Sequence, residues 1–159
     1  MWRETALQHR FPVLYVATRG AVLVLSALIA GACLGGVSDV TIHSGEFLTG
    51  PEGVRFDFEQ SLQRTRKALS IRVVVDGKWE PEPPWKTILM KDGRRIRITA
   101  SLVASDGRIF ESALVGRAGG LDLRFVPPPP RDVSIIAVIL KTDLPILCHE
   151  VKWHEFNPI

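Results

Sequence analysis

Alternation of apolar and polar residues is the feature that most restricts how this 159-residue chain can fold. In residues 54–59 three apolar side chains alternate with three charged ones, and residues 95–102 repeat the pattern over a longer stretch. Residues 121–125 show it again. A period of two places successive side chains on opposite faces of a strand, whereas a helix repeats every 3.6 residues or so. The pattern therefore predicts strands with one face in a core and the other in water.

Asp-Gly pairs mark the turns between these strands. Such pairs adopt the positive backbone angles of tight hairpin turns, and they occur at residues 76–77, 92–93 and 106–107. The second pair is predicted to join residues 85–90 to a long strand, which the third pair turns back on itself. Residues 133–140, VSIIAVIL, are apolar on both faces and are predicted to form a central strand.

Prolines and one polar segment interrupt the strand pattern. Proline lacks the amide donor that a central strand needs, so residues 81–84 break the chain and residues 127–130 form an extended connector between two sheets. Residues 59–68, EQSLQRTRKA, are the only segment suited to a helix, and a simple crossover between strands is the alternative. With frequent turns and no side-chain repeat, residues 38–159 are predicted to fold as one all-β domain, an antiparallel β-sandwich that is immunoglobulin-like or related.

An uncharged apolar stretch near the N-terminus predicts a different role for the first part of the chain. Residues 21–37, AVLVLSALIAGACLGGV, reach the lower limit of the roughly 17 to 25 residues that span a bilayer as a helix. Basic residues precede the stretch and acidic residues follow it, namely Arg3, Arg10 and Arg19 before it and Asp39, Glu46 and Glu52 after it. The positive-inside tendency then places the rest of the chain outside the cytoplasm. We expect residues 1–37 to be a signal or anchor segment, with a basic cytoplasmic head and one hydrophobic helix.

The processing of this segment stays open among three outcomes. Ala30 and Ala32 provide the small-x-small pattern of signal cleavage, which would make Cys33 the first residue of the mature chain. Residues 30–33 also resemble the lipobox of bacterial lipoproteins, with Ala in the first place where Leu is usual; the resemblance implies lipidation of Cys33. The third outcome is an uncleaved anchor. All three export the same domain.

Charge and cysteine content exclude some classes of protein. Without residues 1–32 the chain carries 17 Lys and Arg against 16 Asp and Glu, so it gives no sign of a nucleic-acid partner. Two cysteines, Cys33 and Cys148, are too few for a disulfide scaffold. Cys148 is expected to be a small buried hydrophobe. A bridge between the two cysteines is an alternative only for the cleaved form without a lipid.

The polar tail at residues 148–155 contains the residue types of a metal or catalytic site. On a strand that rises about 3.3 Å per residue, Cys148 and His154 would lie roughly 20 Å apart, and His149 would point to the other face. No Gly-x-Ser-x-Gly elbow surrounds any serine. We therefore expect no catalytic residue, no metal and no cofactor. The inward side chains of this terminal strand are expected to be Leu147, Val151 and Trp153.

Two tryptophans are the best candidates for an exposed contact surface. Trp79 and Trp85 lie among prolines and charged residues, whereas Trp153 suits a core. We expect a non-enzymatic protein-binding or assembly module of the bacterial cell envelope, tethered to the membrane by its N-terminal segment. Its domain would lie in the periplasm or outside the cell and bind an envelope protein. The alternatives are a domain that binds carbohydrate or a small ligand through Trp79 and Trp85, and a hydrolase with an unrecognised site.

Overall fold

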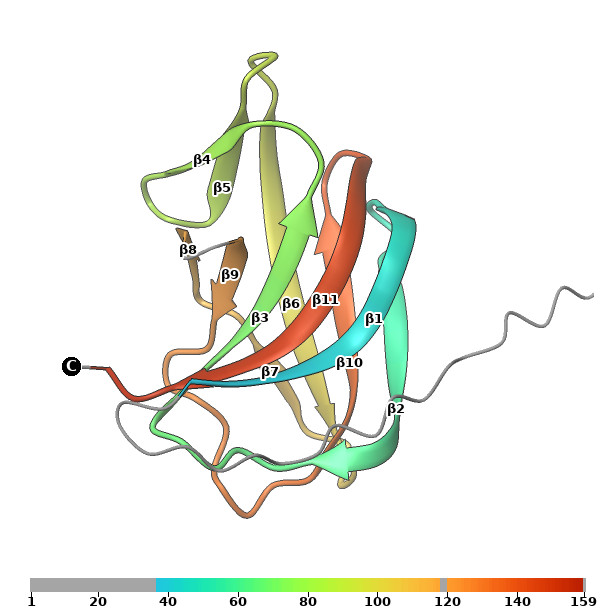
Figure 1. Cartoon of the computed structure of the whole chain (residues 1–159), viewed down its shortest axis with the longest axis vertical. Helices are drawn as coiled ribbons and strands as arrows, with labels where there is room; N and C mark the ends of the chain where they lie inside the picture. Colours follow the sequence, from blue (N-terminus) through green and yellow to red (C-terminus); the bar gives the residue numbers. More distant parts are fainter. Residues whose placement is uncertain (1–36, 118–119, 159) are drawn as a thin grey trace, which may run out of the picture.

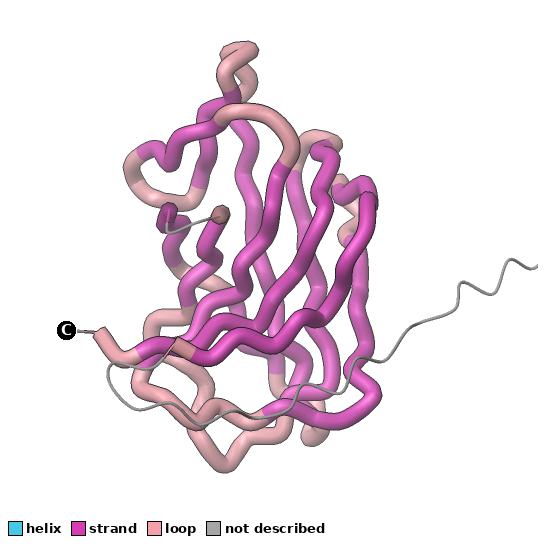
Figure 2. The backbone as a smooth tube through the Cα atoms, in the orientation of Figure 1, coloured by secondary structure: helices cyan, strands magenta, loops and turns pink. Residues whose placement is uncertain are grey.

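The computed structural model describes residues 37–117 and 120–158, and in these ranges the chain forms two antiparallel sheets packed as a sandwich (Figures 1 and 2). The first sheet consists, in spatial order, of β1 (Ser38–Thr49), β11 (Ile146–Phe156), β3 (Ala68–Val75), β9 (Leu121–Arg124) and β8 (Leu114–Arg117). The second consists of β2 (Val54–Leu62), β10 (Ile135–Thr142), β6 (Arg95–Ala104), β5 (Thr87–Met90) and β4 (Trp79–Glu82), and β7 (Ile109–Glu111) also pairs with β6. The predicted all-β sandwich is confirmed.

The core lies between the facing sides of the two sheets. In β6 the inward residues Ile96, Ile98, Ala100 and Leu102 are each at most 2% exposed, while the residues between them face solvent or are half-buried. β3 and β9 contribute inward apolar residues from the first sheet, and Ser70 and Asp122 between them are buried as well. β10 lies between β2 and β6, which confirms the central position predicted for residues 133–140. One-sided burial is therefore the reason that the period of two identified these strands.

The turns follow the Asp-Gly prediction in two of three places. Residues 92–93 join β5 to β6 and residues 106–107 join β6 to β7. At both turns the glycine has a positive φ, and the preceding aspartate accepts a hydrogen bond from the amide two residues on. These hydrogen bonds and the arginine side chains beside them lower the pKa of Asp92 and Asp106. Residues 76–77 instead lead from β3 in one sheet to β4 in the other.

Of the two alternatives for residues 59–68, a helix or a crossover, the structure shows a crossover from β2 in the second sheet to β3 in the first. β2 continues to Leu62, and residues 63–67 form a loop. The amides of Thr65 and Arg66 donate to the carboxylate of Glu155, which is only 3% exposed. Because a buried carboxylate requires donors, this distant partner takes the amides that a helix would have used.

The terminal strand β11 differs from expectation at one position. Val151 and Trp153 point into the core as predicted, but Leu147 is only half-buried, and Ile146 and Cys148 are the inward residues at that end. A register shift between positions 148 and 150 of the pairing with β3 changes the alternation. Cys148 is fully buried, as predicted, and burial raises the pKa of its thiol to about 12.

The predictions for residues 1–36, including the hydrophobic helix and the fate of Cys33, lie outside the described residues. The described part of the chain contains no helix with the length and the apolar character needed to cross a bilayer.

Candidate binding site

Trp85 stands at the edge of the second sheet, in the turn between β4 and β5. Its backbone has a φ of 63°, and it is the one non-glycine residue with a positive φ among those described. Its amide donates to the carbonyl of Glu82 at 2.7 Å, and its carbonyl accepts from the amide of Val115 at 2.6 Å. Val115 belongs to β8, so the second bond connects the two sheets. A left-handed conformation costs a residue with a side chain about 1 to 3 kcal/mol, and it persists only where the surroundings require it.

A groove opens beside this side chain, where the edge of β6 changes partners. β5 pairs with residues 95–97 and β7 with residues 101–103, so neither strand covers the positions between them. At Ala100 both backbone groups bond to Ser112 instead. The result is a hollow of about 270 Å³, called here the Trp85 groove, lined by residues 85–86, 97–99 and 111–115.

The two predicted contact residues have different surroundings. Trp85 is 47% exposed and forms a wall of the groove. Trp79 lies at the other end of β4, packs against the core and has the guanidinium of Arg117 5.5 Å from its ring centroid. One face of the Trp79 ring is therefore occupied, and this residue does not line the Trp85 groove. The structure offers only Trp85 as an aromatic surface for a ligand at this place.

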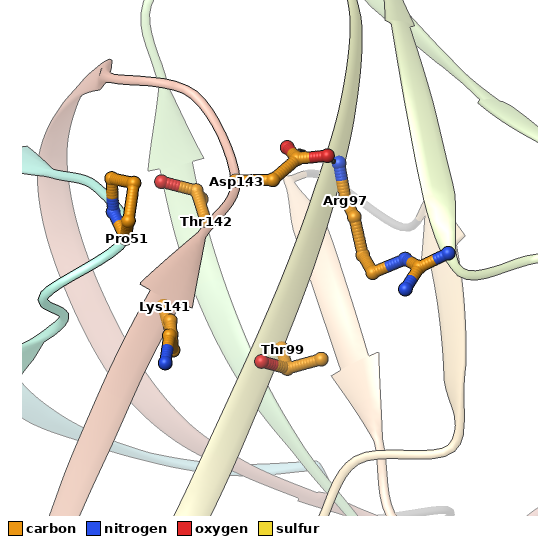
Figure 3. A pocket seen from close by; sticks show the side chains of 6 residues that line it. All are labelled: Pro51, Arg97, Thr99, Lys141, Thr142 and Asp143. Carbon is orange, nitrogen blue, oxygen red and sulfur yellow. Dashed lines mark hydrogen bonds between the residues drawn. The ribbon is translucent and has the colours of Figure 1, made fainter.

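A second hollow of about 300 Å³ lies on the other side of β6 (Figure 3). Six residues line it: Pro51, Arg97, Thr99, Lys141, Thr142 and Asp143. The carboxylate of Asp143 accepts the backbone amide of Arg97 at 2.8 Å, and the side chain of Arg97 extends away from Asp143 (Figure 3). Arg97 and Thr99 line both hollows, so the two are adjacent across β6.

A polar network crosses the outer face of the first sheet. His154, only 6% exposed, contacts the carboxylate of Asp39 through Nδ1, and its Nε2 lies 2.9 Å from Nη2 of Arg72. Because a guanidinium can only donate, Nε2 accepts and Nδ1 carries the proton. Arg72 also donates to the buried Asp122 at 2.8 Å. Both imidazole nitrogens are engaged, so this network joins strands β1, β11, β3 and β9 and leaves His154 no nitrogen to act as a general base.

The tail residues considered for metal binding do not converge. Cys148 points into the core. Nδ1 of His149 lies 3.7 Å from the carboxylate of Glu46, and its Nε2 lies 3.7 Å from the carboxylate of Asp76. Over residues 37–117 and 120–158 no three His, Cys, Asp or Glu side chains come close enough together to bind a metal ion. His154 belongs to the network described above.

Comparison with protein-family models, curated proteins and solved structures found no match for this chain. Function therefore rests on the geometry of the chain itself, and the Trp85 groove is its most specialised feature. Sequence patterns pointed to Trp85 but missed Ser112. Nothing local distinguishes this serine from other polar residues of strands and turns, because strand pairing alone brings it to the groove.

Proposed function

We propose that residues 38–159 form a non-enzymatic module that binds a saccharide in the Trp85 groove, held on the outer side of a bacterial membrane by residues 1–37. The single observation that carries the proposal is the half-exposed indole of Trp85, held on a left-handed backbone beside a hollow. Backbone strain of this kind concentrates at ligand-binding positions. An immunoglobulin-like relationship and a hydrophobic N-terminal helix remain predictions.

The composition of the groove suits a sugar ring. Trp85 and the half-exposed Leu114 present apolar surface, and Thr99 and Ser112 are polar residues of the lining. A sugar has an apolar face of C–H groups and a rim of hydroxyls, so it matches an aromatic wall with a few polar groups. At about 270 Å³ the groove falls just below the roughly 300 to 1,000 Å³ of sites that enclose a drug-sized ligand. It accommodates one ring of a longer molecule.

A protein partner is the competing proposal, and it requires a different surface. A stable protein interface buries about 800 Å² on each partner around an apolar centre. The large exposed apolar side chains of the described residues are distributed over both sheets and several turns, as Leu48, Ile109, Val126 and Leu144 illustrate. A concave site with an aromatic wall therefore favours the saccharide over the envelope protein that the sequence suggested.

The attachment of the N-terminal segment is compatible with a free groove. β1 begins at one end of the sandwich, and the β4–β5 hairpin that carries Trp85 lies in the other half (Figure 1). A tether that precedes Ser38 would thus leave the groove accessible. Cell fractionation tests the tether: the full-length chain should sediment with membranes and be digested by protease added to spheroplasts. Recovery from the soluble cytoplasm would contradict it.

Binding is tested by calorimetric titration of the full-length protein in detergent with a panel of oligosaccharides. At least one should bind, and Trp85→Ala should abolish that binding. Ile109→Ala removes another exposed apolar side chain outside the groove and should leave affinity unchanged. The proposal is wrong if no oligosaccharide binds, or if Trp85→Ala binds as well as the wild type.

A further inference from the structure

We infer that the saccharide is acidic and that it extends from the Trp85 groove across β6 to the second hollow. The inference rests on the proposed function and specifies the ligand. The two hollows share Arg97 and Thr99, so a chain molecule seated on Trp85 meets the second hollow without leaving the outer face of the sheet.

Three cations lie along this path. Lys141 on β10 is the direct neighbour of Thr99 on β6, and Arg97 on β6 is the neighbour of Thr87, the residue after Lys86. Adjacent strands are about 4.8 Å apart, so the backbone positions of these three residues fall within a span of roughly 10 Å. This spacing suits acidic groups on successive units of a short oligosaccharide.

These three cations have no internal partner among the described residues. Lys86, Arg97 and Lys141 are exposed, and none of them forms an ion pair with a described residue. Three other cations of the second sheet and its turns are paired: Arg55 with Asp57, Arg94 with Asp92, and Arg95 with Glu82. Two carboxylates also line the hollows, Asp143 and Glu111, so the three cations exceed the anions by one charge. The path therefore carries more unpaired positive than negative charge and attracts an anion.

A buried hydroxyl group at the second hollow also lacks a partner. Thr142 is 1% exposed, its Oγ1 makes no hydrogen bond, and the oxygen points toward Pro51 on the far wall (Figure 3). Buried hydroxyl groups are normally satisfied, and a missing partner therefore calls for an explanation. A hydroxyl or carboxylate of a bound sugar acid would supply one.

Nucleic acid, the other extended polyanion, is disfavoured by the same surface. Single strands are bound by several stacking aromatics along a strongly basic groove. The path offers one exposed tryptophan, and residues 33–159 carry almost balanced charge. A saccharide with spaced carboxylates fits the single ring and the three cations.

The test is calorimetric titration of the full-length protein in detergent with hexagalacturonate and with its methyl ester, which has the same backbone without charge. The acid should bind about tenfold more tightly than the ester, since hydrogen bonds to charged groups exceed neutral ones by about that factor. Raising the salt concentration from about 50 to 300 mM should weaken binding of the acid and leave binding of the ester unchanged.

Variants locate the effect. Arg97→Gln and Lys141→Gln should each weaken binding of the acid several-fold and leave binding of the ester unchanged, whereas Trp85→Ala should abolish both. Arg55→Gln is the matched control, because Arg55 is an exposed cation of the same sheet already paired with Asp57. Equal affinity for acid and ester, with both dependent on Trp85, overturns the inference and leaves the proposed function standing. If neither the acid nor the ester binds, the inference is wrong. The proposed function is then decided separately by whether any oligosaccharide of the panel binds. Tighter binding of an oligodeoxythymidylate than of the acid also overturns it.

Discussion

Substitution of Trp85 by alanine and by glycine separates the two contributions of this residue to stability. Both substitutions remove the indole and therefore lose the same contacts of its buried half. Alanine retains the cost of a φ of 63°, whereas glycine adopts this conformation without strain. We therefore expect Trp85→Gly to be the more stable of the two variants.

The expected difference follows from two opposing terms. Relief of the left-handed conformation is worth about 1 to 2 kcal/mol, and the greater freedom of glycine in the unfolded chain costs about 0.5 to 1 kcal/mol. The glycine variant should therefore exceed the alanine variant by roughly 1 kcal/mol in free energy of unfolding, equivalent to about 4 °C in Tm for a domain of this size.

Urea and thermal unfolding of the full-length protein, followed by circular dichroism, measure this difference. Ile109 provides the control, because it is 61% exposed and lies in β7 with no positive φ. There the order should be reversed, with Ile109→Ala more stable than Ile109→Gly by about 0.5 to 1 kcal/mol. If Trp85→Gly were no more stable than Trp85→Ala, the backbone at this position would not be strained and the proposed function would lose its main support.

Three further substitutions or measurements test the buried polar groups. Glu155→Gln should lower the free energy of unfolding by about 2 kcal/mol. The carboxylate accepts hydrogen bonds from Trp153 and from the 63–67 loop, so either orientation of a glutamine amide would place its N–H group against another donor. A loss below about 0.5 kcal/mol would contradict this. Asp122→Ala should lower the free energy of unfolding in urea by about 2 kcal/mol, because it removes the buried carboxylate to which Arg72 donates. The double variant with Arg72→Met should lose less than the sum of the two single losses, and strict additivity would show that the pair is not coupled. Cys148 should resist iodoacetamide at about pH 8 until urea unfolds the chain, since burial raises its pKa to about 12 and only the thiolate reacts. Native stability should decline as pH rises from about 9 toward 12, because the unfolded chain then releases this proton first; peptide mass mapping that finds Cys148 labelled in the native protein would refute its burial.

Local chemistry was sufficient to predict most strands and the turns within the second sheet. In residues 95–102 every inward position is apolar because one face of β6 is buried, and this regularity is visible without a structure. Asp-Gly at residues 92–93 and 106–107 forms turns because the pair itself adopts the required backbone angles. Of the two alternatives for residues 59–68, the helix was wrong because amides of this segment bind Glu155, 90 positions away from Thr65 along the chain. No local pattern contains that contact.

The sequence by itself determined that the body of this chain is pleated, that Cys148 is buried and that Trp85 stands in a proline-rich turn, because each of these depends on neighbouring residues or on one-sided burial. Only the tertiary structure decided that Trp85 faces a groove while Trp79 packs under Arg117, and that Lys141 and Arg97 lie on one path. The groove exists because β5 and β7 leave part of β6 unpaired, and because the amide of Val115 on β8, in the other sheet, donates to the carbonyl of Trp85. Such a site depends on pairing between segments far apart in the chain, and the alternation of apolar and polar residues does not specify which strands become neighbours.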